Sequence, residues 1–209
     1  MDRQGKQTQA HYHPIGILFH WLMAVLVFAQ LWWGWRTYLL GPGIEKADAY
    51  ILHAQLGAAI LLAAFMRLGW RIIQPLVAPR MEFPEDLPKW QHTAAELTHG
   101  ILYGLMLALP LSGLAMMGAT APEALTRAIG FSPFANFDMI SRATIEHWAG
   151  VAHALFVWAM MGFVSLHAAA ALKHHFIDRD DVLARMIPAL GSAGDGASPR
   201  MTNHPKTER

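Results

Sequence analysis

The sequence predicts an all-α integral membrane protein, a bundle of four helices that each cross the bilayer. Its composition is the first reason: hydrophobic residues make up 54% of the 209 residues, and charged residues only 15%. The second reason is that no charged residue occurs in four long windows, 15–35, 49–66, 97–122 and 147–172. A bilayer core needs about 20 apolar residues per helix. Four such helices in a soluble chain of this length would leave too little polar chain to cover them.

The first window is expected to be a membrane span rather than a cleaved signal peptide. Its apolar core is long, and no small-residue cleavage site follows it. Its end instead holds three tryptophans, and tryptophan is typical of the interface between membrane and water. They are Trp32, Trp33 and Trp35. With their flanking residues, the four windows predict spans at about 15–36, 49–72, 95–119 and 146–173.

Prolines mark the connection between the second and third spans. Residues 74–90 contain Pro75, Pro79, Pro84 and Pro88. Proline lacks an amide donor and disfavours helix in the residue before it, so this connection is expected to be extended. The domain organisation that follows is a cytoplasmic N-terminal tail at 1–14, a four-helix domain at 15–188 and a disordered C-terminal tail at 189–209.

The distribution of positive charge predicts the orientation. For four spans, both termini and the connection at 67–96 lie on one side of the membrane, and they hold twelve of the sixteen Lys and Arg residues. Loops rich in Lys and Arg stay in the cytoplasm. We therefore expect both termini in the cytoplasm and the lipid bilayer as the first partner of the protein.

Two counts exclude whole classes of function. The formal net charge is +1, so no strong basic field argues for a nucleic-acid partner. The chain has no cysteine, which excludes disulfides, thiolate-held iron–sulfur clusters, cysteine zinc sites and thiol catalysis. Histidine is unusually common instead, at 12 residues.

Six of these histidines lie inside the charge-free windows, where ionisable residues are rare and usually functional. They are His20, His53, His99, His147, His153 and His167. His153 and His167 are 14 residues apart, which is about 21 Å along a helix and about 40° short of four full turns. Both therefore project from nearly the same face, one near each membrane surface. Counted from the helix ends, His20 matches the depth of His167, and His53 matches the depth of His153.

Two histidines facing each other at one depth suit the two axial positions of a b-type haem. The spacing thus predicts two haem sites, held by the pairs His20/His167 and His53/His153. Small residues could leave space beside the ligands: Gly16, Ala24, Gly57, Ala149, Gly150 and Gly162. A zinc site is disfavoured because no acid or third histidine lies at either depth. A proton relay is disfavoured because such relays usually include Asp or Glu.

Three further residues are candidates at the cytoplasmic side. His99 begins the third window, and Lys173 and His174 follow the fourth. Each of them could neutralise a haem propionate or take part in quinone binding. The simpler interpretations are helix packing for His99 and positive residues at the membrane surface for the other two.

Several segments resemble the bacterial cytochrome b561 family. They are residues 19–21 (FHW), residues 52–57 (LHAQLG), residues 108–113 (ALPLSG) and, above all, residues 166–176 (LHAAAALKHHF), with residues 185–188 (RMIP) closing the similarity. The family consists of four-helix dihaem cytochromes of the inner membrane. The resemblance implies that His20, His53, His153 and His167 are the axial ligands of two haem b groups. It also implies electron exchange with ubiquinone and, in some members, oxidation of superoxide.

Three functions follow from these observations. The first is transmembrane electron transfer through two bis-histidine haems, coupled to the ubiquinone pool and in one form to superoxide oxidation. The second is the membrane-anchor cytochrome b subunit of a larger respiratory dehydrogenase or hydrogenase, with a periplasmic electron-transferring partner. The third is a non-redox transporter or scaffold, which predicts that the histidine pairs bind no haem.

Overall fold

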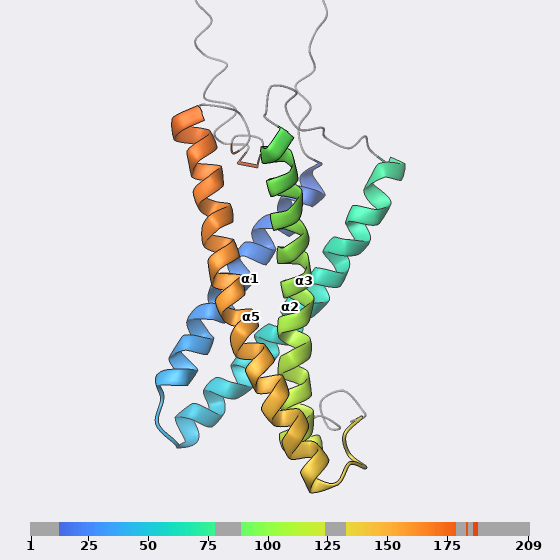
Figure 1. Cartoon of the computed structure of the whole chain (residues 1–209), viewed down its shortest axis with the longest axis vertical. Coiled ribbons are helices and arrows are strands. Elements are labelled where there is room, and N and C mark those ends of the chain that lie inside the picture. Colours follow the sequence, from blue (N-terminus) through green and yellow to red (C-terminus); the bar gives the residue numbers. More distant parts are fainter. Residues whose placement is uncertain (1–12, 78–88, 124–132, 179–182, 184–185, 188–209) are drawn as a thin grey trace, which may run out of the picture. The chain divides into compact units, whose positions relative to one another are not determined.

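In a computed structural model, residues 13–77, 89–123, 133–178, 183 and 186–187 are described. Within these ranges the chain is helical and contains no strand (Figure 1). The long helices are α1 (Pro14–Leu39), α2 (Ile44–Val77), α3 (Lys89–Thr120) and α5 (Met139–Lys173), and a π-helix (His174–Asp178) follows α5. All four long helices in the described part are long and apolar enough to cross a membrane. The all-α membrane fold predicted from the charge-free windows is therefore confirmed.

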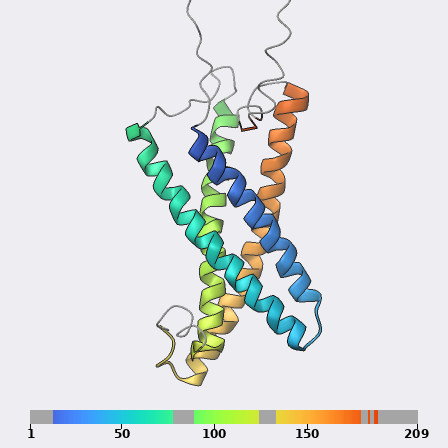
Figure 2. The same ribbon diagram turned by 180° about the vertical axis from the view of Figure 1, so that it is seen from behind.

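The chain divides into two compact units, Met1–His167 and Ala168–Arg209. In the first unit, α1, α2 and α3 alternate in direction, and α1 and α2 meet at a short corner (Figures 1 and 2). All four helices contribute to one hydrophobic core. Its buried members are Met23, Val27, Ile60, Ala63, Ala64, Leu105, Met106 and Met160. The second unit contains the last turns of α5 and the π-helix.

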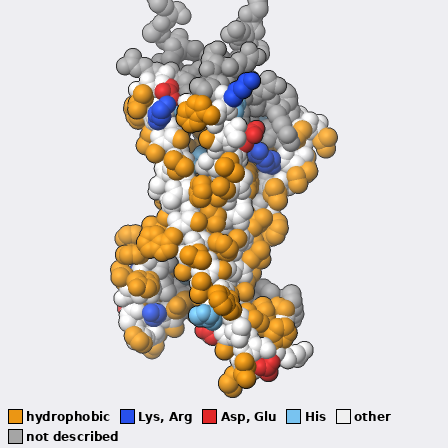
Figure 3. Space-filling model, viewed as in Figure 1, with side chains coloured by type: hydrophobic (Ala, Val, Ile, Leu, Met, Phe, Trp, Pro, Cys, Tyr) orange, Lys and Arg blue, Asp and Glu red, His pale blue; other side chains and the backbone are white. Residues whose placement is uncertain are grey.

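Most of the apolar surface of the helices faces outward rather than into this core. Only 11% of the most apolar stretch of α1 and 17% of that of α3 is buried within the chain. Figure 3 shows hydrophobic side chains over the middle of the helices, with charged side chains toward the ends. Such a surface is unstable in water and suits a lipid environment. Trp32 and Trp35 are both exposed near the end of α1, as expected for interfacial residues.

Side chains next to the helices define where α1 and α5 begin. His13 caps α1 by accepting a hydrogen bond from the amide of Ile15, and Pro14 occupies the first turn, where no amide donor is needed. Asp138 caps α5 by accepting from the amides of Ile140 and Ser141, at 2.9 and 3.0 Å. Hydrogen bonds from the Ser141 hydroxyl and from these amides lower the pKa of Asp138 below its ordinary value.

The helices extend beyond the predicted spans, and one expectation about a connection is wrong. Residues 74–77 belong to α2, which includes Pro75 in its last turn and ends at Val77. The predicted extended connection is therefore helical at its start, and α3 begins at Lys89. A proline near the end of a membrane helix removes one backbone hydrogen bond without ending the helix. Residues 78–88, the tail at 1–12 and the tail at 189–209 lie outside the described residues.

Candidate haem sites

The structure brings together His20 of α1 and His167 of α5, as their spacing predicts. Their ring centroids lie 6.0 Å apart, with the ring planes inclined at 55°. His99 of α3 joins them, with its ring centroid 5.2 Å from that of His167. All three side chains are half-buried. We call this group, His20, His167 and His99, the first histidine cluster.

Arg67 of α2 lies directly against this cluster. Its guanidinium nitrogen Nη2 is 3.2 Å from Nδ1 of His20, and its Nε donates to the hydroxyl of Tyr103 at 3.0 Å. A third contact, at 3.3 Å, runs from Nη1 to the carbonyl oxygen of Phe19. A guanidinium has donors only, so Nδ1 of His20 accepts here. The neutral His20 ring then has its proton on Nε2.

The second predicted pair is also present. His53 of α2 and His153 of α5 have ring centroids 6.2 Å apart and ring planes inclined at 72°. Gln30 of α1 approaches His53 from the other side, because its amide nitrogen donates to the His53 carbonyl at 3.0 Å and lies 3.3 Å from Nε2. Nδ1 of His53 is buried without a hydrogen-bond partner among the described residues.

His153 is held by one turn of α3. Its Nδ1 lies 3.2 Å from the carbonyl oxygen of Leu109 and 2.9 Å from the hydroxyl oxygen of Ser112. The Ser112 hydroxyl donates its own proton to Leu109 at 2.8 Å, so both oxygens act as acceptors toward the ring. Nδ1 of His153 therefore carries the proton. The lone pair of Nε2 is left free, which is the state in which histidine binds a metal.

Two glycines lie where the backbone of a neighbouring helix approaches the imidazole rings of this second pair. A Cβ atom on Gly34 of α1 would lie 3.0 Å from Cε1 of His53, and one on Gly113 of α3 would lie 3.6 Å from Cε1 of His153. The first distance is shorter than ordinary van der Waals contact, so a side chain at position 34 would require the His53 ring to shift by a few tenths of an ångström. Neither glycine is among the small residues expected beside the ligands. Of those, Gly57 lies near Gln30 and Gly162 has nothing within 4 Å.

Both pairs fit an iron atom between two imidazoles. Metal–imidazole bonds of about 2 Å on either side of one metal place the two ring centroids about 6 Å apart, as found in both pairs. The free Nε2 of His153 supplies an unused lone pair for a metal, and Nδ1 of His53 is a buried polar atom without a hydrogen-bond partner among the described residues. The expectation that no third histidine lies at either depth is wrong at the first pair, because His99 of α3 joins His20 and His167.

Lys173 and His174 belong to the second unit. Both contact the carboxylate of Asp178: Lys173 through an ion pair, and His174 through Nδ1 at 3.3 Å. The basic pair expected at the end of the fourth span thus includes an acid that the sequence analysis did not consider. Their role toward a haem or a quinone stays a prediction.

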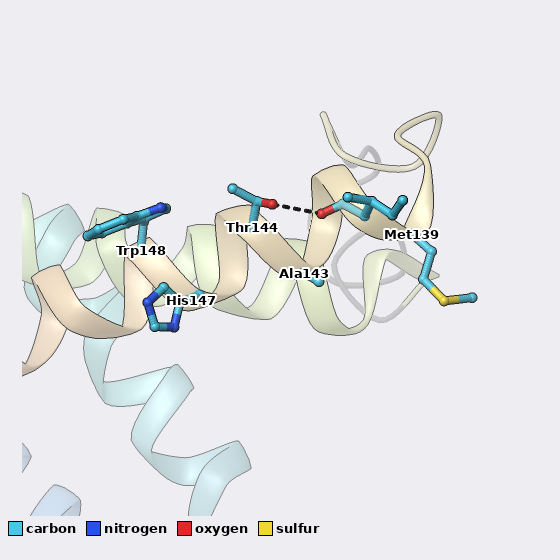
Figure 4. Close-up of a pocket in the computed structure, with 6 residues that line it drawn as sticks. Met139, Ala143, Thr144, His147 and Trp148 are labelled. Atoms are coloured by element: carbon cyan, nitrogen blue, oxygen red, sulfur yellow. Dashed lines mark hydrogen bonds between the residues drawn. The ribbon is translucent and has the colours of Figure 1, made fainter.

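His147 joins neither pair. It is exposed and lines an open pocket at the start of α5 together with Met139, Ile140, Ala143, Thr144 and Trp148 (Figure 4). The Thr144 hydroxyl donates to the carbonyl oxygen of Ile140 in this pocket, at 2.9 Å. The lining comes from one helix, and its outer side chains Met139 and Ile140 are largely exposed.

The sequence does not predict the following residues beside the two pairs: Gln30, Gly34, Arg67, Leu109, Ser112 and Gly113. Arg67 could have been suspected, because it lies immediately after a charge-free window in the sequence. Serine, glutamine and glycine are ordinary residues of membrane helices. Ser112 and Gly113 lie in the stretch 108–113 that resembles the cytochrome b561 family, whereas nothing in the spacing of Gln30 or Gly34 distinguishes them from other residues of the spans.

A sequence profile described as "Prokaryotic cytochrome b561" matches residues 11–189 of this chain. Among curated proteins, the chain is 31% identical over 188 residues to "Cytochrome b561 homolog 2" of Escherichia coli (strain K12). That alignment covers 86% of this chain and 93% of the relative.

Two other relatives are similar over nearly their whole length. "Cytochrome b561 homolog 1" of Escherichia coli (strain K12) is 32% identical over 198 residues, covering 90% of this chain and 98% of the relative. "Probable superoxide oxidase CybB" of Yersinia pestis is 28% identical over 182 residues, covering 85% of this chain and 96% of the relative.

Proposed function

Because the chain belongs to the prokaryotic cytochrome b561 family, a family of haem-binding membrane electron-transfer proteins, we propose that it moves electrons between two b-type haems. One haem is held by His20 and His167, and the other by His53 and His153. The observation that supports this most directly is that both pairs have the same ring separation, 6.0 and 6.2 Å. Bound haem supplies the one-electron chemistry, and the protein supplies ligands, orientation and an apolar surrounding.

The described residues have distinct tasks in this proposal. His153 donates its Nδ1 proton to Leu109 and Ser112, which fixes the ring and keeps Nε2 available to iron. Gly34 allows the His53 ring to lie close to α1. The apolar core between the two pairs excludes water.

The finer steps of the function follow from the family and from charge. We infer that electrons are exchanged with ubiquinone, and that His99 lies at or near the quinone because it touches His167. Lys173 and His174 are further candidates for the quinone or a propionate. With most Lys and Arg residues on the side of the termini, the first histidine cluster belongs to the cytoplasmic half of the inner membrane. One relative bears the name of a probable superoxide oxidase, which makes superoxide the first donor to test.

The central experiment is a count of haems and ligands in the purified protein. We expect two haems per chain and a reduced-minus-oxidised spectrum with a b-type alpha band. His153→Ala should remove or make high-spin one haem and leave the other. His147→Ala is the matched control, because His147 lies on the same helix, is exposed and joins neither pair. A wild-type chain that binds no haem, or a His153→Ala variant with an unchanged spectrum, contradicts the proposal.

Quinone exchange is tested separately. The reduced protein should be reoxidised rapidly by a short-chain ubiquinone, and His99→Leu should slow this step while both haems remain bound. Mixing the oxidised protein with superoxide under the same conditions tests the donor. Reduction of haem by superoxide in the wild type supports the oxidase form. Absence of any reaction with quinone removes the quinone assignment but leaves the haem assignment standing.

A further inference from the structure

Two arginines near the first histidine cluster have positive charge that no acid balances. Arg67 and Arg71 are four residues apart on α2 and therefore project from the same helix face. Both guanidiniums lie against the ring of Tyr103 on α3, at 5.4 and 5.5 Å from its centroid. Among the residues that the structure describes, neither arginine forms an ion pair with a carboxylate.

The contacts that Arg67 does make are poor substitutes for an anion. Its three acceptors are a backbone carbonyl, a phenol and the imidazole of His20, all neutral and at 3.0–3.3 Å. Arginine binds carboxylates through two parallel charged hydrogen bonds, which are shorter and stronger than these. Two neighbouring cations at the end of an apolar span are costly unless an anion joins them. The two arginines therefore have the chemistry of a carboxylate-binding site.

The contact with His20 adds a second, independent reason. Because Arg67 donates to Nδ1, the neutral His20 ring carries its proton on Nε2. His153 at the other site has the opposite arrangement, with Nδ1 protonated and Nε2 free. For His20 to bind iron through Nε2 in the same way, Arg67 must leave Nδ1. An anion that attracts the guanidinium achieves this.

We propose that Arg67 and Arg71 bind a propionate carboxylate of the haem held by His20 and His167. The proposal rests on the haem assignment above and deepens it. When the carboxylate takes the Arg67 guanidinium, Nδ1 of His20 is free to hold the proton and Nε2 is free to bind iron. Binding of the carboxylate would thereby be coupled to the availability of His20 for iron, whereas His153 would need no such coupling because the Leu109 carbonyl already accepts from its Nδ1. Arg67 is a positioning residue in this proposal, since it acts on iron through His20.

The test combines a change in the protein with a change in the cofactor. In full-length protein carrying both His53→Ala and His153→Ala, neither ligand of the second site remains, and only the first site can be filled. This protein and its Arg67→Gln/Arg71→Gln form are reconstituted with haem and with haem dimethyl ester, in which both carboxylates are blocked. The low-spin spectrum and the haem dissociation constant are measured in each case.

We expect the arginine changes to weaken haem binding roughly 10- to 100-fold, as for loss of charged hydrogen bonds. Blocking the carboxylates should weaken binding to the unchanged arginines by a similar factor. Haem dimethyl ester should bind the Arg67→Gln/Arg71→Gln form as tightly as haem does, because this form no longer has the arginines that the carboxylates would contact. If the loss of affinity from the arginine changes and the loss from blocking the carboxylates simply multiply, the two groups do not interact and the proposal is overturned. The proposal is also overturned if the arginine changes have no effect on haem affinity.

Three controls separate the alternative explanations. Arg36→Gln removes an arginine that already has a carboxylate partner, Glu45 at 3.0 Å, and should leave haem binding unchanged. Arg67→Lys/Arg71→Lys retains charge and should recover part of the affinity, which shows that the variant chain folds. An arginine effect that appears only with anionic phospholipid present, and equally with the ester, assigns the site to a lipid phosphate and overturns the propionate assignment. Absence of any haem in the wild type instead contradicts the proposed function.

Discussion

Arg67 and His20 are joined by a contact of 3.2 Å between Nη2 and Nδ1, in which the imidazole accepts the hydrogen bond. At the other pair, His153 donates from the same ring nitrogen to the Leu109 carbonyl. His20 and His153 are thus opposite tautomers: the proton is on Nε2 of His20 and on Nδ1 of His153. One site is arranged around a cation, and the other around neutral backbone and hydroxyl groups.

The cation predicts unequal reduction potentials. A positive charge near iron stabilises the reduced state, so Arg67→Gln should lower the midpoint potential of one haem by tens of millivolts, on the order of 1 kcal/mol. The other haem should keep its potential, and Arg67→Lys should shift the first less than Gln does. Potentiometric titration of the two alpha-band components measures this. Equal shifts of both haems, or a rise, would contradict the assignment of Arg67 to one site.

Ser112→Ala should loosen His153 without releasing it. The change removes the acceptor at 2.9 Å but leaves the Leu109 carbonyl at 3.2 Å. Loss of a residue that orients a metal-bound histidine typically costs 10- to 100-fold in affinity, and the remaining carbonyl predicts an effect of about tenfold or less. Haem retention during washing measures it. Thr144→Ala, which removes another hydroxyl on a membrane helix, should retain haem as the wild type does.

Three glycines form a graded test of the space beside the second pair. Gly34→Ala places a Cβ atom 3.0 Å from the His53 ring, so the ring must move and the electron paramagnetic resonance of one haem should change. Gly113→Ala, at 3.6 Å from His153, makes an ordinary contact and should have a small effect. Gly162→Ala meets no atom within 4 Å and serves as the control. Equal behaviour of the three variants would show that Gly34 does not limit the ring.

The cap of α5 predicts a pH dependence of stability. Hydrogen bonds from Ser141 lower the pKa of Asp138 in the folded protein, so the ionised cap stabilises the fold above the pKa of the unfolded aspartate. This contribution is lost as the pH falls through the lower folded value, below about pH 4. Asp138→Ala should therefore be less stable than the wild type at neutral pH, and the difference should vanish in acid. Asp138→Asn keeps an uncharged cap and should flatten the pH dependence of thermal unfolding.

The fold and the two histidine pairs could be predicted because membranes impose strict rules. An apolar core of fixed thickness excludes charge, so the absence of charge located the helices. Helical periodicity then related His153 to His167, and equal depth related them to His53 and His20. In the structure, His20 lies beside His167 and His53 lies beside His153, as expected.

The features that the sequence does not predict depend on contacts between helices. Pro75 predicts extended chain, yet α2 continues through it because a proline near a helix end disturbs few hydrogen bonds. The position of Arg67 in the sequence indicates only a positive charge at the membrane edge. Ser112 and Gly34 become meaningful only when α3 and α1 are packed against the histidines. Helix rotation, which decides these contacts, has no signature in spacing along one helix.

The carbonyl of Leu109 has an evolutionary consequence. A main-chain oxygen stays in place whatever side chain occupies the position, so mutation at 109 does not remove the acceptor that orients His153. Ser112 supplies a duplicate acceptor on the same turn. The hydrogen bond that orients His153 thus persists through any change of the side chain at 109 and through loss of the hydroxyl at 112, whereas the contact of His20 with Arg67 is lost with that one side chain.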